Sequence, residues 1–241
     1  MIWKLGDHRL ACGDARDMAL VKELIGTMKI HAVITDPPYG VSVVESKVGI
    51  SPLKAHKVIE NDDIDSDPEY AMFTKDWLIP VLPRLAKKNS VYIFNADKML
   101  FALKNGMDDA HVRFSQLVIW VKNHAIIGRK DYLPQHELIV FGWYGTHTFR
   151  RSKDKSVLFY PKPNKSPYHP TTKPLGLIRH LVLNATEIGD VVYDAFGGSG
   201  TTLLACELLK RRCYMVEHDS EYCATIIKRW EQMTKRKAER V

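Results

Sequence analysis

An acidic turn follows the apolar run Ala32–Ile34, where the chain reads Asp36-Pro37-Pro38-Tyr39. Each proline ring holds its own φ near about −65°, and the residue before a proline is pushed away from the helical region. These residues therefore predict a stiff, extended turn that carries a carboxylate and an aromatic ring just beyond a strand. Turns at the carboxyl ends of strands are where open α/β sheets bind their ligands.

A glycine-rich turn at residues 194–202 is the second candidate site and reads DAFGGSGTT. Its glycines would let the backbone turn sharply and approach a ligand closely. The phosphate-binding loop of an ATPase requires a lysine beside the final Ser or Thr, whereas here Gly200 is followed by two threonines. In a nucleoside-binding turn, an acid at the end of the next strand binds the ribose hydroxyls. Glu217 follows the next apolar run, Cys213–Val216, and fits this second interpretation.

A third polar stretch, residues 169–174, reads HPTTKP and leads into a helical pattern. It is interpreted either as the turn that starts this helix or as a polar cluster beside the same pocket as the glycine-rich turn.

Apolar runs that alternate with helical patterns supply the elements that must position these motifs. Short apolar runs indicate buried parallel strands, and their alternation with helices favours a doubly wound α/β sheet. In the second predicted helix, Asp67 is expected to be the N-cap, followed by a proline at the first helical position. Residues 41–63 and 142–170 fit neither pattern, and loops of this length are usually functional. The predicted strands are Ala32–Ile34, Val91–Phe94, Leu117–Val121, Leu138–Phe141, Val191–Tyr193 and Cys213–Val216, and the predicted helices are Ala19–Thr27, Asp67–Leu85, Pro174–Ala185, Thr201–Lys210 and Glu221–Lys235.

The composition is that of one folded domain, with 241 residues, of which 45% are hydrophobic and 26% charged. We find no apolar run of about 18 residues and no signal-peptide pattern, so neither a membrane span nor export is expected. The four cysteines form no Cys-x-x-Cys pair, which predicts reduced thiols in a cytoplasmic protein and no metal site.

The net charge of +7 is concentrated in one segment. Between Lys122 and Lys173, ten Lys or Arg residues stand against three Asp or Glu, and aromatic residues such as Trp143 and Tyr160 lie among them. This mixture suits the phosphates and exposed bases of a nucleic acid, although a solvated surface segment would have a similar composition. The prediction is a nucleic-acid partner.

Together, the motifs at 36–39, 169–174 and 194–202 resemble the amino-methyltransferases of DNA, which transfer a methyl group from S-adenosylmethionine to adenine N6 or cytosine N4. The order, with DPPY before the glycine-rich turn, is similar to that of the β class. The opening LGDHRLACGDARD, with IENDD at 59–63 and WVKNH at 120–124, looks closest to methylase modules fused to ParB-type nuclease domains.

The resemblance covers nearly the whole chain and implies one Rossmann-like methyltransferase domain over residues 1–241. Its doubly wound sheet is expected to carry helices on both faces and long loops that face DNA. Residues 41–63 would form a loop over the target base or the duplex, and residues 122–168 would recognise DNA.

The resemblance also assigns cofactor roles to the matching positions. Asp14 would lie near the cofactor adenine, Glu217 would bind the ribose hydroxyls, and residues 169–173 would close over the amino-acid end. Ala195 stands where the family pattern usually has proline, which loosens the turn but removes no functional group. The cofactor-binding residues implied in this way are Asp14, Ala15, His169, Thr171, Thr172, Lys173, Asp194, Phe196, Gly197, Gly198, Ser199, Gly200, Thr201 and Glu217.

Asp36, Pro37, Pro38 and Tyr39 are the implied catalytic residues. The lone pair of an exocyclic amine is delocalised into the base, so the nitrogen must become more tetrahedral before it can attack a methyl sulfonium. The Asp36 carboxylate and the Pro37 carbonyl can each accept one N–H bond of this amine, and the charged acceptor also stabilises the cation that forms. The target base must be flipped out of the duplex, and the Tyr39 ring is placed to stack on it.

Double-stranded DNA is the expected substrate, and a homodimer and a cognate restriction endonuclease are plausible partners. Adenine is favoured over cytosine because the cytosine enzymes more often carry serine at the position of Asp36. A catalytically silent DNA-binding module and an RNA or protein methyltransferase are the alternatives from other classes. The expected DNA contacts are Lys47, Lys54, Lys57, Lys122, Arg129, Lys130, Arg150 and Arg151.

Overall fold

The computed structural model describes residues 1–38, 66–125, 131–151, 153–162 and 172–241. The predicted loop at 41–63 lies outside the described residues. The same is true of eight predicted site residues, namely Tyr39, Lys47, Lys54, Lys57, Arg129, Lys130, His169 and Thr171.

One mixed sheet of eleven strands runs through the described part of the chain. In spatial order its strands are β11 (Glu239–Arg240), β1 (Ile2–Leu5), β2 (His8–Cys12), β10 (Arg212–Glu217), β9 (Val191–Asp194), β3 (Ile30–Thr35), β4 (Leu85–Asn95), β6 (His136–Tyr144), β5 (Val112–Val121) and β8 (Val157–Phe159), and β7 (Thr146–His147) pairs with β4.

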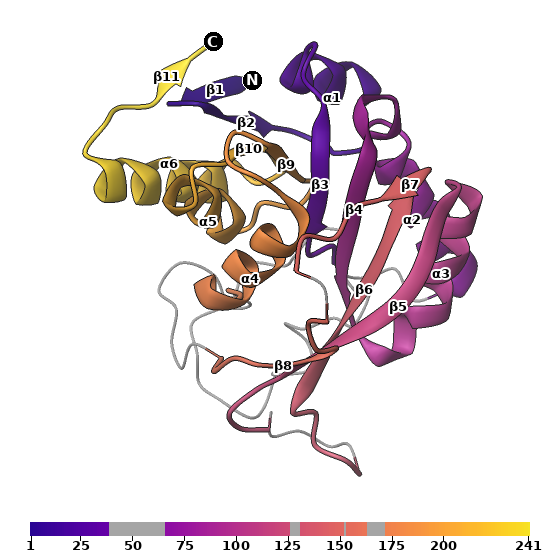
Figure 1. The fold of residues 1–241 in the computed structure, drawn as a ribbon. Helices are drawn as coiled ribbons and strands as arrows, with labels where there is room; N and C mark the ends of the chain where they lie inside the picture. The colour runs from indigo at the N-terminus through magenta and orange to yellow at the C-terminus, as the bar shows by residue number, and fades with distance from the viewer. Residues whose placement is uncertain (39–65, 126–130, 152, 163–171) are drawn as a thin grey trace.

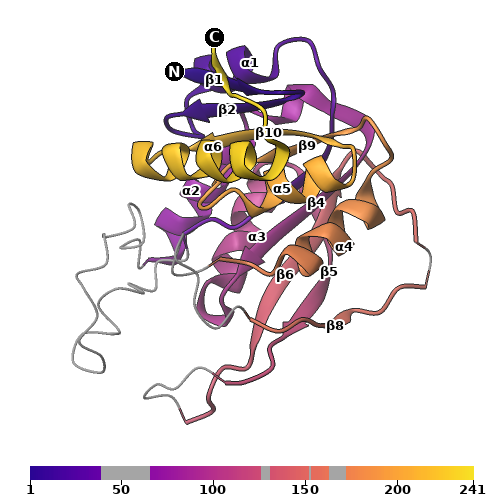
Figure 2. The same ribbon diagram turned by 90° about the vertical axis from the view of Figure 1, so that its left-hand side faces the viewer.

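Helices cover both faces of the sheet, as Figures 1 and 2 show. A hydrophobic cluster on one face joins the strands to α1 (Met18–Ile25), α2 (Asp67–Leu78) and α3 (Leu100–Asp109). A second cluster joins the other face to α4 (Leu175–Ala185), α5 (Thr201–Leu208) and α6 (Ser220–Thr234). The predicted doubly wound fold is therefore confirmed. None of the helices in the described part of the chain is long and apolar enough to cross a membrane.

The parallel core of the sheet contains β2, β10, β9, β3 and β4. From β3 the chain moves outward to β4, whereas from β9 it moves the opposite way to β10. The point where the winding reverses therefore lies between β3 and β9, which pair through Ala32 and Val192. Ligands of open α/β sheets bind outside the strand ends at such a point.

All six predicted strands lie within observed strands, but the prediction that all are parallel is wrong for Leu138–Phe141. This run belongs to β6, which is antiparallel to both β4 and β5. An apolar run records burial on both faces and not the direction of the strand, so the reversal could not be predicted from it.

The predicted helix Asp67–Leu85 is too long, because α2 ends at Leu78. Pro80 lacks an N–H to continue the helix, although Ile79 before it still has helical backbone angles. A short 3₁₀ turn, Leu82–Arg84, then leads directly into β4. The N-cap of α2 is Ser66 rather than Asp67, so the expected cap is displaced by one residue. Helix α3 and the β1–β2 hairpin were not predicted.

Candidate active site

The acidic turn and the glycine-rich turn meet at the reversal point of the sheet. Thr35, the last residue of β3, donates its hydroxyl to Asp194 Oδ1 at 2.8 Å and accepts from the Ala195 N–H at 3.1 Å. Asp36 follows directly, and its side chain is 24% exposed while Pro37 is buried. The Asp36 carboxylate therefore lies at the sheet edge beside the glycine-rich turn, as the two motifs predicted.

The glycine-rich turn requires glycine at two positions. Gly198 has a φ of 52° and Gly200 a φ of 82°, both in the left-handed region that other residues rarely adopt. The turn is fixed by a bond from the Gly200 N–H to the Gly197 carbonyl at 2.8 Å and by another from the Gly197 N–H to the Val216 carbonyl at 2.9 Å. Gly200 is also the N-cap of α5, and no side chain caps this helix end.

Glu217, at the end of β10, is tied to the same turn. Its carboxylate accepts the Gly198 N–H at 2.6 Å and the Asp219 N–H at 2.8 Å. Burial raises the pKa of Glu217, and these two backbone donors partly oppose the shift. The predicted pairing of a glycine-rich turn with an acid on the next strand is thus present in the structure.

Asp194 is a buried acid that holds this edge of the sheet together. Its carboxylate accepts hydrogen bonds from Thr35 and from the Phe196 N–H, the latter at 3.2 Å. Burial raises the pKa of Asp194 to about 7, and the nearby charge of Asp36 adds to the shift, while the hydrogen bonds from Thr202 and Thr35 oppose it. Asp194 therefore titrates near neutral pH.

This raised pKa makes folding stability depend on pH with a defined sign. The folded state favours the protonated form of Asp194. The contribution of this group to the free energy of unfolding is therefore complete below the ordinary pKa of 3.8 and is lost as the pH rises through about 7. We expect the free energy of unfolding of wild type, relative to Asp194→Asn, to fall between pH 5 and 7.5 by at most about 1.4 kcal/mol per pH unit. Urea unfolding at several pH values measures this difference, with the exposed Asp109→Asn as control. If the free energy of unfolding changed with pH in the same way for wild type and Asp194→Asn, the prediction would be wrong.

An aromatic and ionic cluster lies beside the turn. The Phe196 ring packs edge-on against Trp77, with ring centres 5.6 Å apart, and at a tilt against Phe73, with ring centres 5.8 Å apart. Asp14 accepts from the Arg16 guanidinium, with Nη2 to Oδ2 at 2.7 Å, and this guanidinium also lies over the Phe73 ring. Burial alone would raise the pKa of Asp14, but hydrogen bonds from Arg16 outweigh it and lower the pKa. Asp14 thus keeps its charge, as a ligand contact would need.

The described end of the third motif reaches both turns. The Thr172 hydroxyl lies 3.3 Å from the Ser199 hydroxyl in the glycine-rich turn. The Lys173 ammonium donates to Asp36 Oδ2 and lies 3.3 Å from Glu137 Oε2. Lys173 was predicted to contact the cofactor, and the structure instead brings it onto the predicted catalytic carboxylate.

Lys122 is not placed to contact DNA phosphates, which corrects one predicted DNA contact. Its side chain is 2% exposed, and its ammonium pairs with Glu137 Oε1 at 2.8 Å. Sequence reasoning missed Glu137, which stands at the start of β6. An acid next to the buried run Leu138–Phe141 was the available signal, because a buried charge needs a partner.

Arg150 and Arg151 are exposed, as a DNA contact requires, but Arg150 already has a partner. Its guanidinium pairs with Glu187 at 2.6 Å, and its N–H bonds the Asn184 carbonyl at 2.8 Å. Asp154 bonds both His180 and Asn184. The described segment around Arg150 and Asp154, within the predicted DNA-recognition region, is therefore anchored on α4.

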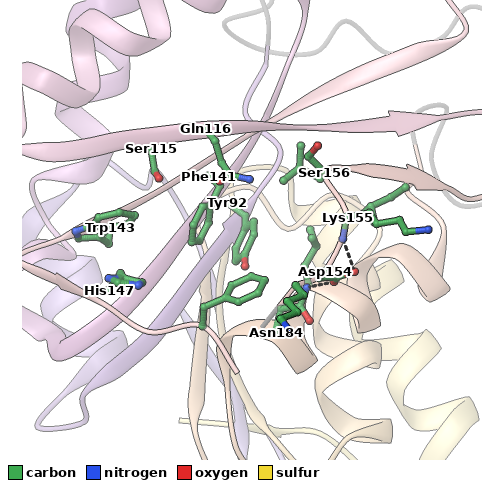
Figure 3. Close-up of a pocket in the computed structure, with 15 residues that line it drawn as sticks. Tyr92, Ser115, Gln116, Phe141, Trp143, His147, Asp154, Lys155, Ser156 and Asn184 are labelled. Atoms are coloured by element: carbon green, nitrogen blue, oxygen red, sulfur yellow. Dashed lines mark hydrogen bonds between the residues drawn. The ribbon is translucent and has the colours of Figure 1, made fainter. Parts of the chain in front are cut away.

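A cavity of about 330 Å³ opens beneath this anchored segment, between the sheet and α4. Figure 3 shows the rings of Tyr92, Phe141 and Trp143 on one side and the Asp154–Asn184 pair on the other. No predicted catalytic or cofactor-binding residue lines it, so it is separate from the candidate active site.

The polar groups at the reversal point of the sheet fit S-adenosylmethionine. The cofactor carries ribose hydroxyls, an ammonium group and a carboxylate, and the site offers the carboxylates of Glu217 and Asp194. The Thr201 hydroxyl is buried in the first turn of α5 and has no hydrogen-bond partner among the described residues. Buried polar groups are normally satisfied, so this hydroxyl fits a polar ligand group at the helix start.

A glycine-rich turn at the reversal point of a doubly wound sheet, paired with an acid on the next strand, defines a Rossmann-like nucleoside-binding fold. A family model described as DNA methylase, covering N6 and N4 methyltransferases, matches residues 30–156 and 143–229. The chain belongs to this family of DNA methyltransferases, which depend on S-adenosylmethionine.

Curated relatives and solved structures agree with this assignment. The type II methyltransferase M.HpaI of Haemophilus parainfluenzae is 26% identical over 90% of this chain and 72% of its own length. M1.MboII of Moraxella bovis is 22% identical over 89% of this chain and 92% of its own length. The M1.HpyAVI–SAM complex superposes with a TM-score of 0.66 at 24% identity, covering 91% of this chain and 98% of that chain. The cytosine-N4-specific PvuII methyltransferase gives a TM-score of 0.72 at 17% identity, covering 95% of this chain and 91% of that chain. The likeness to ParB-fused modules stays a prediction.

Proposed function

We propose that the protein methylates the N6 amine of adenine in duplex DNA after flipping the base out of the helix. The observation that carries this proposal is the position of Asp36, a carboxylate at the sheet edge that is linked through Thr35 to the glycine-rich turn. Aspartate rather than serine at this position favours adenine over cytosine N4. Tyr39 is the proposed stacking partner of the flipped base.

Asp36 and Pro37 would act on the amine together. The carboxylate of Asp36 and the backbone carbonyl of Pro37 each accept one N–H bond, which directs the nitrogen lone pair toward the methyl group. When bound, S-adenosylmethionine would supply that methyl group from its sulfonium, and the S–C bond would be exchanged for the new N–C bond. The amine becomes cationic and then loses a proton to water, and Asp36 stabilises the positive charge while it lasts. Proline at 37 suits this role because its fixed φ sets the direction of the carbonyl.

Glu217 and the glycine-rich turn would hold the cofactor in line with the amine, which is itself a large part of the rate enhancement. We assign the ribose hydroxyls to Glu217 and the adenine to the side of Asp14 and Ala15. The amino-acid end would lie near Asp194 and Thr172. Remaining members of the proposed cofactor site are His169, Thr171, Phe196, Gly197, Gly198, Ser199, Gly200 and Thr201.

The proposed DNA contacts lie in two segments. Arg150 and Arg151 belong to the described part of the recognition region, and Arg150 would exchange Glu187 for a phosphate. Lys47, Lys54, Lys57, Arg129 and Lys130 belong to the segments outside the described residues. Lys122 is withdrawn from this set because it is buried and paired with Glu137.

Methyl transfer from labelled S-adenosylmethionine to mixed genomic DNA, followed by nucleoside analysis, tests the proposal. We expect label in N6-methyladenine and none with Asp36→Ala. Label in N4-methylcytosine would keep the mechanism but change the base. If folded protein that binds the cofactor by calorimetry labels no DNA nucleoside, the proposal fails in favour of an RNA or protein substrate or a silent module.

A further inference from the structure

Four side chains of alternating charge form a series of ion pairs that begins at Asp36. Lys173 contacts both Asp36 and Glu137, and Lys122 contacts Glu137 from the other side. They come from the end of β3, the segment before α4, the start of β6 and the residue after β5. The two lysine side chains are 8% and 2% exposed, so this is not an ordinary solvated surface cluster.

We propose, on the basis of the function proposed above, that Lys173 is the positioning residue of Asp36, whose ammonium orients the carboxylate and keeps it ionised for the target amine. Glu137 and Lys122 would act one step further away by holding Lys173 in place. This role differs from the cofactor contact that the sequence motif implied for Lys173.

The surroundings of Asp36 create the need for such a partner. Asp194 lies on the neighbouring strand and is joined to the same corner through Thr35. The charge of Asp36 is one cause of the raised pKa of Asp194, so the charge of Asp194 must in turn favour protonation of Asp36. Lys173, Glu137 and Asp194 are charged groups among the described residues that face this corner. Lys173 is the cation among them, and a cation in contact with a carboxylate favours its ionised form.

The environment of Lys173 keeps it charged despite its burial. Burial lowers the pKa of Lys173, but the charges of Asp36 and Glu137 outweigh this effect and raise it. Its ammonium also lies 5.0 Å from the centre of the Phe94 ring, where a cation is stabilised. Lys122 gives Glu137 a second cation, so Glu137 has both of its oxygens beside a positive charge.

Lys173→Met and Lys173→Arg test this role when the single-turnover methylation rate at saturating cofactor is measured from pH 5.5 to 9.5. For Lys173→Met we expect the acid limb of the profile to move up by about 1 to 2 pH units, because a cation beside an Asp lowers its pKa by about that much. The rate loss is then about 10- to 100-fold on the acid limb of the wild-type profile, and it shrinks as the pH rises above the shifted limb. The acid limb of Lys173→Arg should lie close to that of wild type, since arginine keeps the positive charge. The matched control is Lys87→Met, an exposed lysine near the start of β4.

Calorimetric titration with S-adenosylmethionine separates this role from a cofactor contact. We expect Lys173→Met to bind within about three-fold of wild type. A loss of cofactor affinity above about ten-fold with an unmoved acid limb would overturn the inference and return Lys173 to the cofactor site. An equal rate loss at every pH would overturn it as well.

A measurement that needs no catalysis distinguishes this inference from the proposed function. In protein labelled with ¹³C at the aspartate carboxyls, the Asp36 resonance is the one lost in Asp36→Asn. Its titration midpoint should rise in Lys173→Met, and likewise in Lys173→Gln, which remains available if the first variant does not fold. An unchanged midpoint in a folded variant would contradict the inference even if the enzyme methylates DNA, whereas a raised midpoint would support it even if no DNA base is methylated.

Discussion

Replacing Asp36 with Ala is expected to reduce methyl transfer by about 10²- to 10³-fold while S-adenosylmethionine binding stays within about three-fold of wild type. The variant removes the only charged acceptor that we assign to the target amine, and removal of one preorganised electrostatic group from an active site typically costs about 10² to 10³ in rate. The cofactor-binding turn should persist, because its own bonds to Glu217 and Val216 do not involve Asp36.

Single-turnover methylation with a cofactor titration on the same preparation checks both halves of this result. Asp36→Asn is the isosteric companion, and it should be almost as slow because the amide lacks the charge. Asp109→Asn, an exposed acid at the end of α3, controls for the general effect of losing a carboxylate. Near-normal turnover of Asp36→Ala would show that the mechanism is wrong, and a parallel loss of cofactor binding would place Asp36 in the cofactor site.

Glu217→Ala should have the opposite profile, with cofactor affinity reduced by about 10- to 100-fold and the rate at saturating cofactor within a few-fold of wild type. A hydrogen bond to a charged group contributes about 1.5 to 3 kcal/mol, and each 1.4 kcal/mol is a ten-fold change in affinity. The variant also leaves the Gly198 and Asp219 N–H groups without their present acceptor, so some loss of folding stability is expected.

Calorimetry with S-adenosylmethionine measures the affinity, and Glu217→Gln separates the two effects. The amide retains an oxygen that can accept one of the two backbone N–H groups, so we expect the Gln variant to lose less stability than the Ala variant. It should still bind the cofactor more weakly than wild type, because its acceptor is neutral. Unchanged affinity in a folded Glu217→Ala would remove Glu217 from the cofactor site.

The motifs predicted the location of the site because the residues that carry the chemistry stand at the ends of predicted strands. DPPY and DAFGGSGTT each directly follow a short apolar run, and parallel strands bring such ends to the same sheet edge. The special backbone at Gly198 and Gly200 is likewise local, since left-handed φ values favour glycine.

The charged residues around Asp36 could not be predicted in the same way. Lys122 was assigned to DNA because a positive charge in a basic segment is usually solvated, and only tertiary packing buries it beside Glu137. Glu137 was missed because its position at the site depends on the reversed direction of β6. Helix α3 was also missed, and its sequence LFALKNGMDD places a glycine and polar residues within the helix.

The reversed strand also makes one part of this enzyme separable from the rest. Because β5 and β6 are antiparallel, the chain leaves the sheet at Val121 and re-enters it at His136 on the same edge as the active site. If residues 122–168 recognise DNA as proposed, the segment between these two strands could be exchanged or lengthened while the strands that carry Asp36 and the glycine-rich turn stay unchanged. On the proposed function, such an enzyme would acquire a new DNA target by altering one hairpin connection, provided that Lys122 and Glu137, which flank this connection, are retained.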